Sequence, residues 1–133
     1  MDFEIAQVAP DQYEFVRALR NDSKTKQGFI VQDYITKEQQ VKYMEVNNSN
    51  YYICFADGEP VGYVGVVESD IRVAVHPNYL NLGVGEFMVR YIMNKFPEAS
   101  AKIRNTNLAS KQLFEKCGFV PEFLIYKNPS ATK

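Results

Sequence analysis

The chain has 133 residues and a formal net charge of −1, from 15 basic and 16 acidic side chains. This length allows one domain around a single hydrophobic core, and a hydrophobic fraction of 46% is typical of a folded chain rather than a disordered one. The balanced charge argues against nucleic acid or an anionic membrane as the main partner, because both require a basic surplus.

Targeting and metal signals are missing from the sequence. The N-terminal residues lack the basic and apolar regions of a secretory signal, and no apolar run approaches the ~20 residues of a membrane span. Two cysteines, Cys54 and Cys117, and one histidine, His76, do not form a recognisable metal site, and the cysteines fit small buried side chains. We therefore expect a cytoplasmic protein with one domain over residues 1–133 and a frayed tail over 128–133.

Hydrophobic periodicity and turn signals predict the secondary structure of the first half of the chain. Residues 3–8 alternate as in a strand, and a helix is expected to begin at Pro10. After a polar loop, Thr36 and Gln39 stand at the spacing of a capping box and predict a second helix. Two β-rich runs on either side of Asp57-Gly58 predict a hairpin with a two-residue turn.

The second half alternates between strands and helices. The run DIRVAVHP, stopped by Pro77, predicts a strand, a helix follows from Gly85 to Pro97, and a further helix ends near Gly118 at its C-cap. Strands are expected over residues 99–107 and 121–127. The resulting order, β-α-α-β-β-β-α-β-α-β, predicts a mixed α+β domain.

Two glycines, Gly83 and Gly85, stand where a strand and loop meet a helix. The first N–H groups of a helix have no intrahelical partner and lie at its positive end, so this loop could bind an anion such as a pyrophosphate. The same glycines also fit an ordinary strand-to-helix turn. Local topology alone leaves both interpretations open.

Three ordered segments carry a family resemblance. VAVHPNYLNLGVGEFMVRYI, residues 73–92, resembles motif A of the GNAT (Gcn5-related N-acetyltransferase) superfamily, and NTNLASKQLFEKCGFV, residues 105–120, is similar to its motif B. The hairpin YYICFADGEPVGYVGV, residues 51–66, resembles the stretch before motif A. The match covers roughly the C-terminal two-thirds of the chain.

The resemblance implies an α+β fold with about four helices and a mostly antiparallel sheet, in which two parallel strands splay into a V. It implies acetyl-CoA as the cosubstrate and no metal. The pantetheine arm would bond the main chain of the strand that contains Val73, Ala74 and Val75. The pyrophosphate would bind the backbone amides of Leu82, Gly83, Val84, Gly85 and Glu86. Asn107, Ser110 and Phe114 on motif B would line the cofactor, although Asn107 also fits an N-cap.

The resemblance further implies direct attack by an amine on acetyl-CoA within a ternary complex. The N–H near Val73 would stabilise the oxyanion. Glu68, Asp70 and His76 are the candidate bases, and Glu68 and Asp70 would share a face only if no turn separates them. All three also fit solvated turn or loop positions.

Two positions depart from the family pattern. Leu80 stands where Arg or Gln is common, which leaves the backbone amides in place. Phe114 stands where many members have a tyrosine that protonates the departing thiolate, and phenylalanine cannot donate a proton. Tyr126 or a water molecule could take that role. The alternative is a regulatory or interaction domain that binds CoA without turnover.

The N-terminal part resembles a narrower subgroup, which acetylates amino groups on nucleotide-linked sugars. Residues 19–21 (LRN) and 35–43 (ITKEQQVKY) fit its scheme, with Gln40 in place of the more frequent histidine. Arg20 and Asn21 would then lie where the acceptor enters, although both also fit an ordinary helix end. A small-molecule amine is the expected acceptor, an amino-sugar nucleotide first among polyamines, amino acids, antibiotics and protein N-termini. The superfamily also pairs into homodimers, which an exposed last strand could support.

Overall fold

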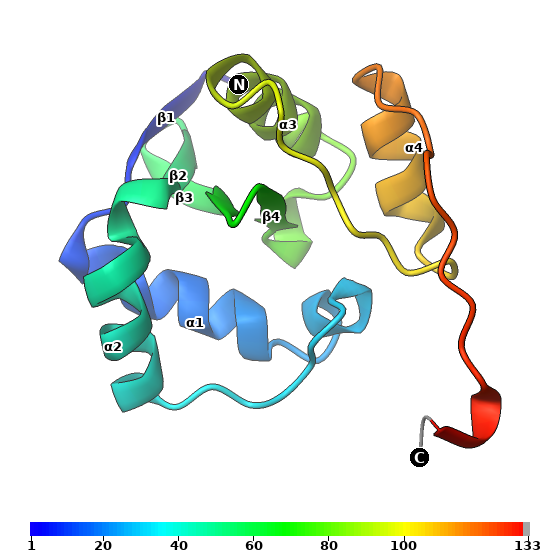
Figure 1. Ribbon diagram of the computed structural model, residues 1–133. Coiled ribbons are helices and arrows are strands. Elements are labelled where there is room, and N and C mark those ends of the chain that lie inside the picture. The colour runs from blue at the N-terminus through cyan, green and yellow to red at the C-terminus, as the bar shows by residue number, and fades with distance from the viewer. Residues whose placement is uncertain (132–133) are drawn as a thin grey trace.

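The computed structural model describes residues 1–131 of the chain. Its sheet has the order β1 (Phe3–Gln7), β2 (Tyr51–Ala56), β3 (Glu59–Val67) and β4 (Asp70–Val75), with every neighbouring pair antiparallel. The helices α1 and α2 lie on one side of this sheet and α3 lies on the other, with α4 beside β4 (Figure 1). The predicted α+β class and mostly antiparallel sheet are confirmed.

The first two helices form where the sequence predicts them. A 3-10 turn over Pro10–Gln12 leads into α1 (Tyr13–Asn21), and α2 spans Lys37–Asn47. The predicted capping box is confirmed: the Gln39 N–H donates to Thr36 Oγ1 at 3.1 Å, and the Thr36 N–H donates to Gln39 Oε1 at 2.9 Å. Between the helices, a loop contains the short 3-10 turn η2 (Thr25–Gly28).

Two tight turns connect the three C-terminal strands of the sheet. Asp57 and Gly58 both have positive φ, at 50° and 85°, which confirms the predicted two-residue turn between β2 and β3. A second turn, which the sequence left open, separates β3 from β4: Glu68 and Ser69 have φ of 52° and 63°. The condition for a shared face of Glu68 and Asp70 is therefore not met, because Asp70 begins a new strand.

The remaining helices pack on the face of the sheet opposite to α1 and α2. The 3-10 turn η4 (Pro77–Tyr79) follows β4, and α3 spans Val84–Lys95 while α4 spans Leu108–Lys116. Gly118 has a φ of 93° directly after the C-cap Cys117, as expected for a glycine that ends a helix. Side chains of α3 and α4 bury one face of the sheet, and α1 and α2 bury the other around Met44 and Tyr63.

The two last predicted strands are wrong within the described residues. Of residues 99–107, only Ser100 pairs with β4, in one parallel bridge to Asp70. Residues 121–127 form no strand and are exposed, because the segment at 101–104 offers no ladder for them to join. Within the expected tail, Pro129–Ala131 form a short 3-10 turn, and the last two residues of that tail lie outside the described residues.

Candidate active site

A pocket of about 200 Å³ lies at the open edge of β4. One wall is β4 itself, from Asp70 to Val73, and the segment from Ala101 to Ile103 faces it. The Ile71 N–H donates to the Ser100 carbonyl at 2.8 Å, so the two segments are joined at the start of β4 and separate after it. The expected V between two parallel strands is therefore not formed as such: one parallel bridge joins the segments, and residues 101–104 form no strand.

The hydrogen-bonding direction along β4 decides which backbone groups face the pocket. The His76 N–H donates to Val61 on β3, whereas the Ile71 N–H points away from β3, to Ser100. Because directions alternate in an antiparallel ladder, Val73 and Val75 also point to the open edge. Ala74 differs from the expectation: its N–H and C=O lie on the β3 side, and its buried side chain packs toward α1 and α2.

The N-terminus of α3 presents free backbone donors. Gly83 is the N-cap with a left-handed φ of 86° and no side-chain cap, and the first intrahelical bond runs from Phe87 N–H to the Gly83 carbonyl. The N–H groups of Val84, Gly85 and Glu86 precede that bond and have no partner within the helix. The Leu82 side chain before them is 49% exposed.

Glycine is needed at the two positions of this loop for different structural reasons. Gly83 requires its positive φ, and a Cβ there would meet only Phe3, at 3.9 Å. A Cβ on Gly85 would lie 3.1 Å from Leu113 Cδ2 on α4, so Gly85 permits the close approach of α3 and α4. Glu86 pairs with Arg90 and Lys116 at 2.9 Å and 3.1 Å, and hydrogen bonding to them lowers the pKa of its carboxyl group.

Motif B contributes α4 to the pocket. Ser110 and Phe114 lie one turn apart and line it, and Phe114 is buried in a T-shaped contact with Phe119. Asn107 is the N-cap of α4, because its Oδ1 accepts from the Ser110 N–H at 3.1 Å. Its Nδ2 donates to the carbonyl of Gly28 at 3.5 Å, so Asn107 supports the pocket wall rather than lining it.

The candidate acid and base groups are widely separated. Asp70 lines the pocket, and its Oδ2 accepts from Arg72 Nε at 2.9 Å. Its other oxygen, Oδ1, is buried without a hydrogen-bond partner among residues 1–131. Glu68 is exposed on the turn, and Tyr126 is 88% exposed on the C-terminal segment. His76 lies beside a separate pocket of about 360 Å³ next to α1, where its Nδ1 accepts from the Asn78 N–H.

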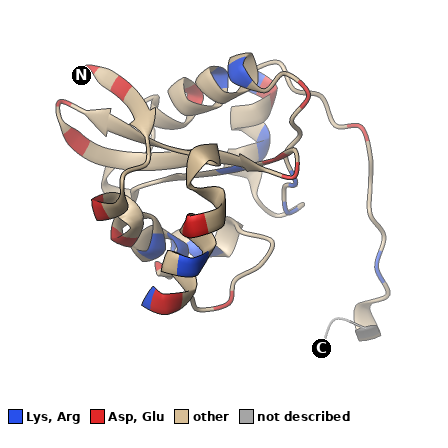
Figure 2. Cartoon of the chain, turned by 60° about the vertical axis from the view of Figure 1, so that its left-hand side comes forward, with Lys and Arg blue, Asp and Glu red and all other residues tan. Residues whose placement is uncertain are grey.

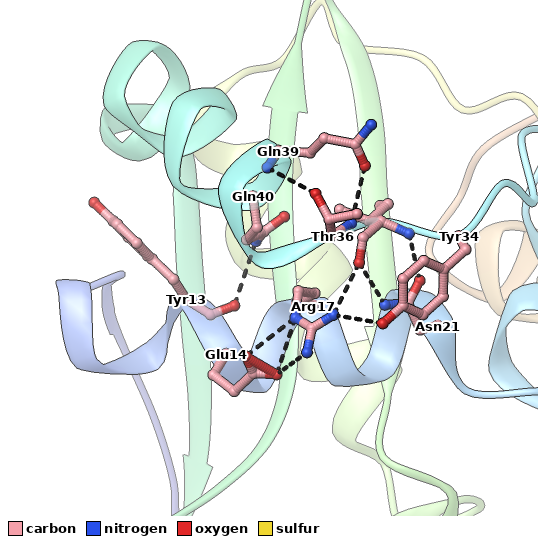
Figure 3. A network of polar contacts seen from close by, with 9 residues as sticks. Tyr13, Glu14, Arg17, Asn21, Tyr34, Thr36, Gln39 and Gln40 are labelled. Carbon is pink, nitrogen blue, oxygen red and sulfur yellow. Dashed lines mark hydrogen bonds and ion pairs between the residues drawn. The ribbon is translucent and has the colours of Figure 1, made fainter.

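The two expected acceptor residues lie in different places. Arg20 lines the pocket, with its guanidinium 5.2 Å from the centre of the Phe29 ring. Asn21 instead ties down the loop before α2: its Nδ2 donates to the Ile35 carbonyl and its Oδ1 accepts from the Ile35 N–H. Arg17 donates to the same carbonyl at 2.9 Å, as Figure 3 shows.

Several pocket residues were not predicted. The loop over residues 28–31 covers one side, and Arg104 holds it by donating to the carbonyls of Phe29 and Ile30 at 2.7 Å and 3.2 Å. Tyr63 and Arg72 also line the pocket. Figure 2 shows the central strands almost free of charge, and a charged residue within the apolar strand DIRVAV is the sequence signal that could have identified Arg72.

Burial dominates the titration of the tyrosines at this site. It raises the pKa of Tyr63 above the ordinary value, and the charges of Arg20 and Arg72 oppose that shift. The pKa of Tyr51 is raised for the same reason, and its hydroxyl is 2.8 Å from that of Tyr43. The hydroxyls of Tyr51 and Tyr63 therefore stay protonated at neutral pH.

Residues 13–119 match the family described as the acetyltransferase (GNAT) family. The chain belongs to this family. The match spans the pocket, α3 and α4, whereas β1 precedes it. A comparison with curated protein sequences gives no match.

Solved structures of proteins described as acetyltransferases or putative acetyltransferases have the same fold. Spermidine N-acetyltransferase from Vibrio cholerae, in complex with CoA and spermine, is 13% identical with a TM-score of 0.79, over 91% of this chain and 82% of that one. An N-acetyltransferase from Staphylococcus aureus Mu50 is 15% identical with a TM-score of 0.77, over 90% and 84%. YncA from Salmonella typhimurium, solved with its cofactor acetyl-CoA, is 14% identical with a TM-score of 0.76, over 89% and 79%.

Neither a membrane-spanning helix nor a metal-binding cluster is found among the described residues. None of the helices in residues 1–131 has the length and hydropathy that crossing a membrane requires. The same residues contain no group of three or more His, Cys, Asp or Glu side chains that could hold a metal ion.

Proposed function

We propose that the protein transfers an acetyl group from acetyl-CoA to a primary amine by direct attack in a ternary complex. One observation carries the proposal: the open edge of β4 faces a pocket and leads to a helix N-terminus with unused donors. A thioester cosubstrate with a phosphate-bearing tail requires both features. Bound acetyl-CoA would supply the activated acetyl group.

The cofactor would extend along β4. The outward main-chain groups of Val73 and Val75 suit the amides of the pantetheine arm, and Ser110 and Phe114 would border it from α4. The N–H groups of Val84, Gly85 and Glu86 suit the pyrophosphate.

Within the pocket, the Val73 N–H would stabilise the negative charge that develops on the carbonyl oxygen. An unperturbed alkylamine, with a pKa of ~10.4, is neutral in only about one molecule in 10³ at pH 7, so attack requires a proton acceptor. Asp70 is our choice of base, because it lines the pocket and one of its oxygens is unpartnered among the described residues.

The departing thiolate has no tyrosine on α4 to protonate it, because Phe114 occupies that wall. A thiol with an unperturbed pKa of ~8.5 is a tolerable leaving group near neutral pH, and water or Tyr126 remains the proposed acid. Tyr126 would have to approach from the exposed C-terminal segment. Phe114 also favours the second candidate function, a domain that binds CoA without turnover.

For the acceptor we retain an amino-sugar nucleotide as the first choice, in a cytoplasmic protein. The proposal rests on the resemblance of residues 19–43 and on the position of Arg20 in the pocket. Gln40, where the subgroup favours histidine, is buried and donates to the Tyr13 carbonyl at 3.4 Å, so here it links α2 to α1 (Figure 3). Polyamines, amino acids, antibiotics and protein N-termini complete the panel to be tested.

Calorimetric titration with acetyl-CoA tests the proposal. We expect saturable binding by the wild type and a large loss in Gly83→Glu, which places a carboxylate at the helix N-terminus. Gly58→Glu is the matched control, because Gly58 has a similar φ of 85°, no atom within 4 Å of a Cβ, and a position on the turn between β2 and β3, outside the pocket. Binding that persists in Gly83→Glu, or no heat in the wild type, would contradict the cofactor site. CoA release with the amine panel then separates an enzyme from a binding domain.

A further inference from the structure

Two guanidinium groups in the pocket retain unused hydrogen-bond donors. Arg20 takes part in none of the ion pairs found among residues 1–131, and the ring of Phe29 lies against it. Arg72 gives only its Nε to Asp70, so both of its terminal nitrogens are without a hydrogen bond to another described residue. Both arginines line the same pocket as the buried Tyr63, and their charges lower its pKa against the larger effect of burial.

The charge of the pocket lining is positive. Its basic side chains are Arg20, Arg72 and Lys102, whereas Asp70 is its one acidic side chain among the described residues. Asp70 is already paired with Arg72 at 2.9 Å, so its charge is largely compensated. A polycationic amine would be repelled by such a pocket, and an amine that also carries an anion would be attracted.

These arginines lie away from the place where the cofactor phosphates are expected to bind. Asp70 and Arg72 lie at the start of β4, where the bridge to Ser100 closes the opening, whereas the α3 donors follow the end of the strand. From Arg72 to Val75 the strand spans about 10 Å, and the loop of residues 76–83 follows before the α3 donors, so the two cationic regions are separate. Arg20 and Tyr63 belong to the face of the sheet covered by α1 and α2, opposite to α3 and α4.

We propose that Arg20 and Arg72 form an anion subsite for the acceptor, which therefore carries a phosphate or carboxylate in addition to its amine. Guanidinium groups bind both anions through two parallel hydrogen bonds. With the anion at Arg20 and the free Nη groups of Arg72, the amine would lie toward Asp70 and the Val73 N–H. This inference deepens the proposed acetyltransferase function and rests on it for the identity of the occupant.

Anion binding can be measured without turnover. The protein is first saturated with CoA, which occupies the α3 donors, and is then titrated calorimetrically with inorganic phosphate. We expect the wild type to bind phosphate and Arg20→Gln to bind about tenfold or more weakly. Lys26→Gln is the matched control, because Lys26 is a basic residue of the neighbouring η2 turn and does not line the pocket. Thermal unfolding and CoA binding of Arg20→Gln establish that it is folded.

A pair of acceptors that differ only in a phosphate tests the same subsite during catalysis. We expect glucosamine 6-phosphate to be acetylated with a lower KM than glucosamine, and Arg20→Gln to remove that difference while Arg20→Lys restores part of it. Spermidine should be a poorer acceptor than either sugar.

The outcomes are distinguishable. Equal phosphate binding by wild type and Arg20→Gln, or spermidine as the preferred acceptor, would overturn the anion subsite. Failure of acetyl-CoA itself to bind would instead refute the proposed function. Arg20-dependent phosphate binding would then still support a subsite for an anion.

Discussion

At the scale of single residues, Asp70 combines two features that no other candidate base shares. It lines the pocket, and its Oδ1 is buried without a hydrogen bond among residues 1–131. Asp70→Asn keeps the shape and an oxygen for Arg72 but removes the basic carboxylate. We expect kcat to fall by about 10²- to 10⁴-fold while the Kd of acetyl-CoA stays unchanged. Steady-state kinetics and calorimetry measure the two quantities.

Glu68→Gln is the control for this change. Glu68 is two residues away and also acidic, but it is exposed on the turn between β3 and β4. Its kcat should remain that of the wild type. A loss of kcat in Glu68→Gln with full activity in Asp70→Asn would reverse the assignment and show that the loop reaches the substrate.

At the scale of elements, the sequence predicted those features that are stabilised by contacts between neighbouring residues. The capping box of Thr36 and Gln39 and the turn at Asp57-Gly58 involve neighbouring residues only, so both could be predicted from the sequence. The turn at Glu68-Ser69 stayed open in the sequence, because it lacks glycine and asparagine, the usual residues for positive φ.

The two predicted strands over residues 99–107 and 121–127 fail to form for a different reason. The β-rich segment 121–127 has the composition of a strand, but a strand exists only beside a partner. Its neighbour would be the segment 101–104, which leaves β4 after Ser100 and lines the pocket. The candidate site shows the same contrast. The spacing of the motifs predicted that α3 and α4 lie at the site. Tyr63 and the 28–31 loop reach the site through strand pairing and through contacts between residues far apart in sequence, which the sequence does not reveal.

The 28–31 loop supports a prediction about the acceptor side. Arg104 holds this loop by donating to the carbonyls of Phe29 and Ile30, across more than 70 residues of sequence. Arg104→Met removes both bonds but keeps most of the side-chain volume. We expect the acceptor KM to rise several-fold and the Kd of acetyl-CoA to stay unchanged, because a hydrogen bond to a charged group contributes about 1.5–3 kcal/mol.

Steady-state kinetics gives the KM, and amide exchange followed by mass spectrometry should show faster exchange in residues 28–31. Lys42→Met is the control, since Lys42 is exposed on α2. Weaker acetyl-CoA binding with an unchanged acceptor KM would contradict this prediction and assign the loop to the cofactor.

At the scale of the whole molecule, the sheet ends in an unpaired edge and the chain ends in an unpaired apolar segment. The segment is drawn red in Figure 1 and extends away from the rest of the fold. Phe123, Leu124, Ile125 and Tyr126 are 79–88% exposed there. Consecutive exposed apolar side chains of this kind mark an association surface or an aggregation risk. Together with the pairing expected of the superfamily, they lead us to propose a homodimer formed through this segment.

Light scattering coupled to size-exclusion chromatography tests the dimer. We expect the wild type to elute as a dimer and Phe123→Asp/Ile125→Asp to elute as a monomer, because two buried carboxylates would oppose association. Val46→Asp is the matched control: Val46 is an equally exposed apolar residue, at 78%, but it lies on α2. A wild-type monomer at high concentration, or a dimer that survives both aspartates, would refute this interface. If monomerisation also lowers kcat without changing the Kd of acetyl-CoA, the segment that contains Tyr126 contributes to catalysis only in the assembled protein, as the proposed thiolate acid would require.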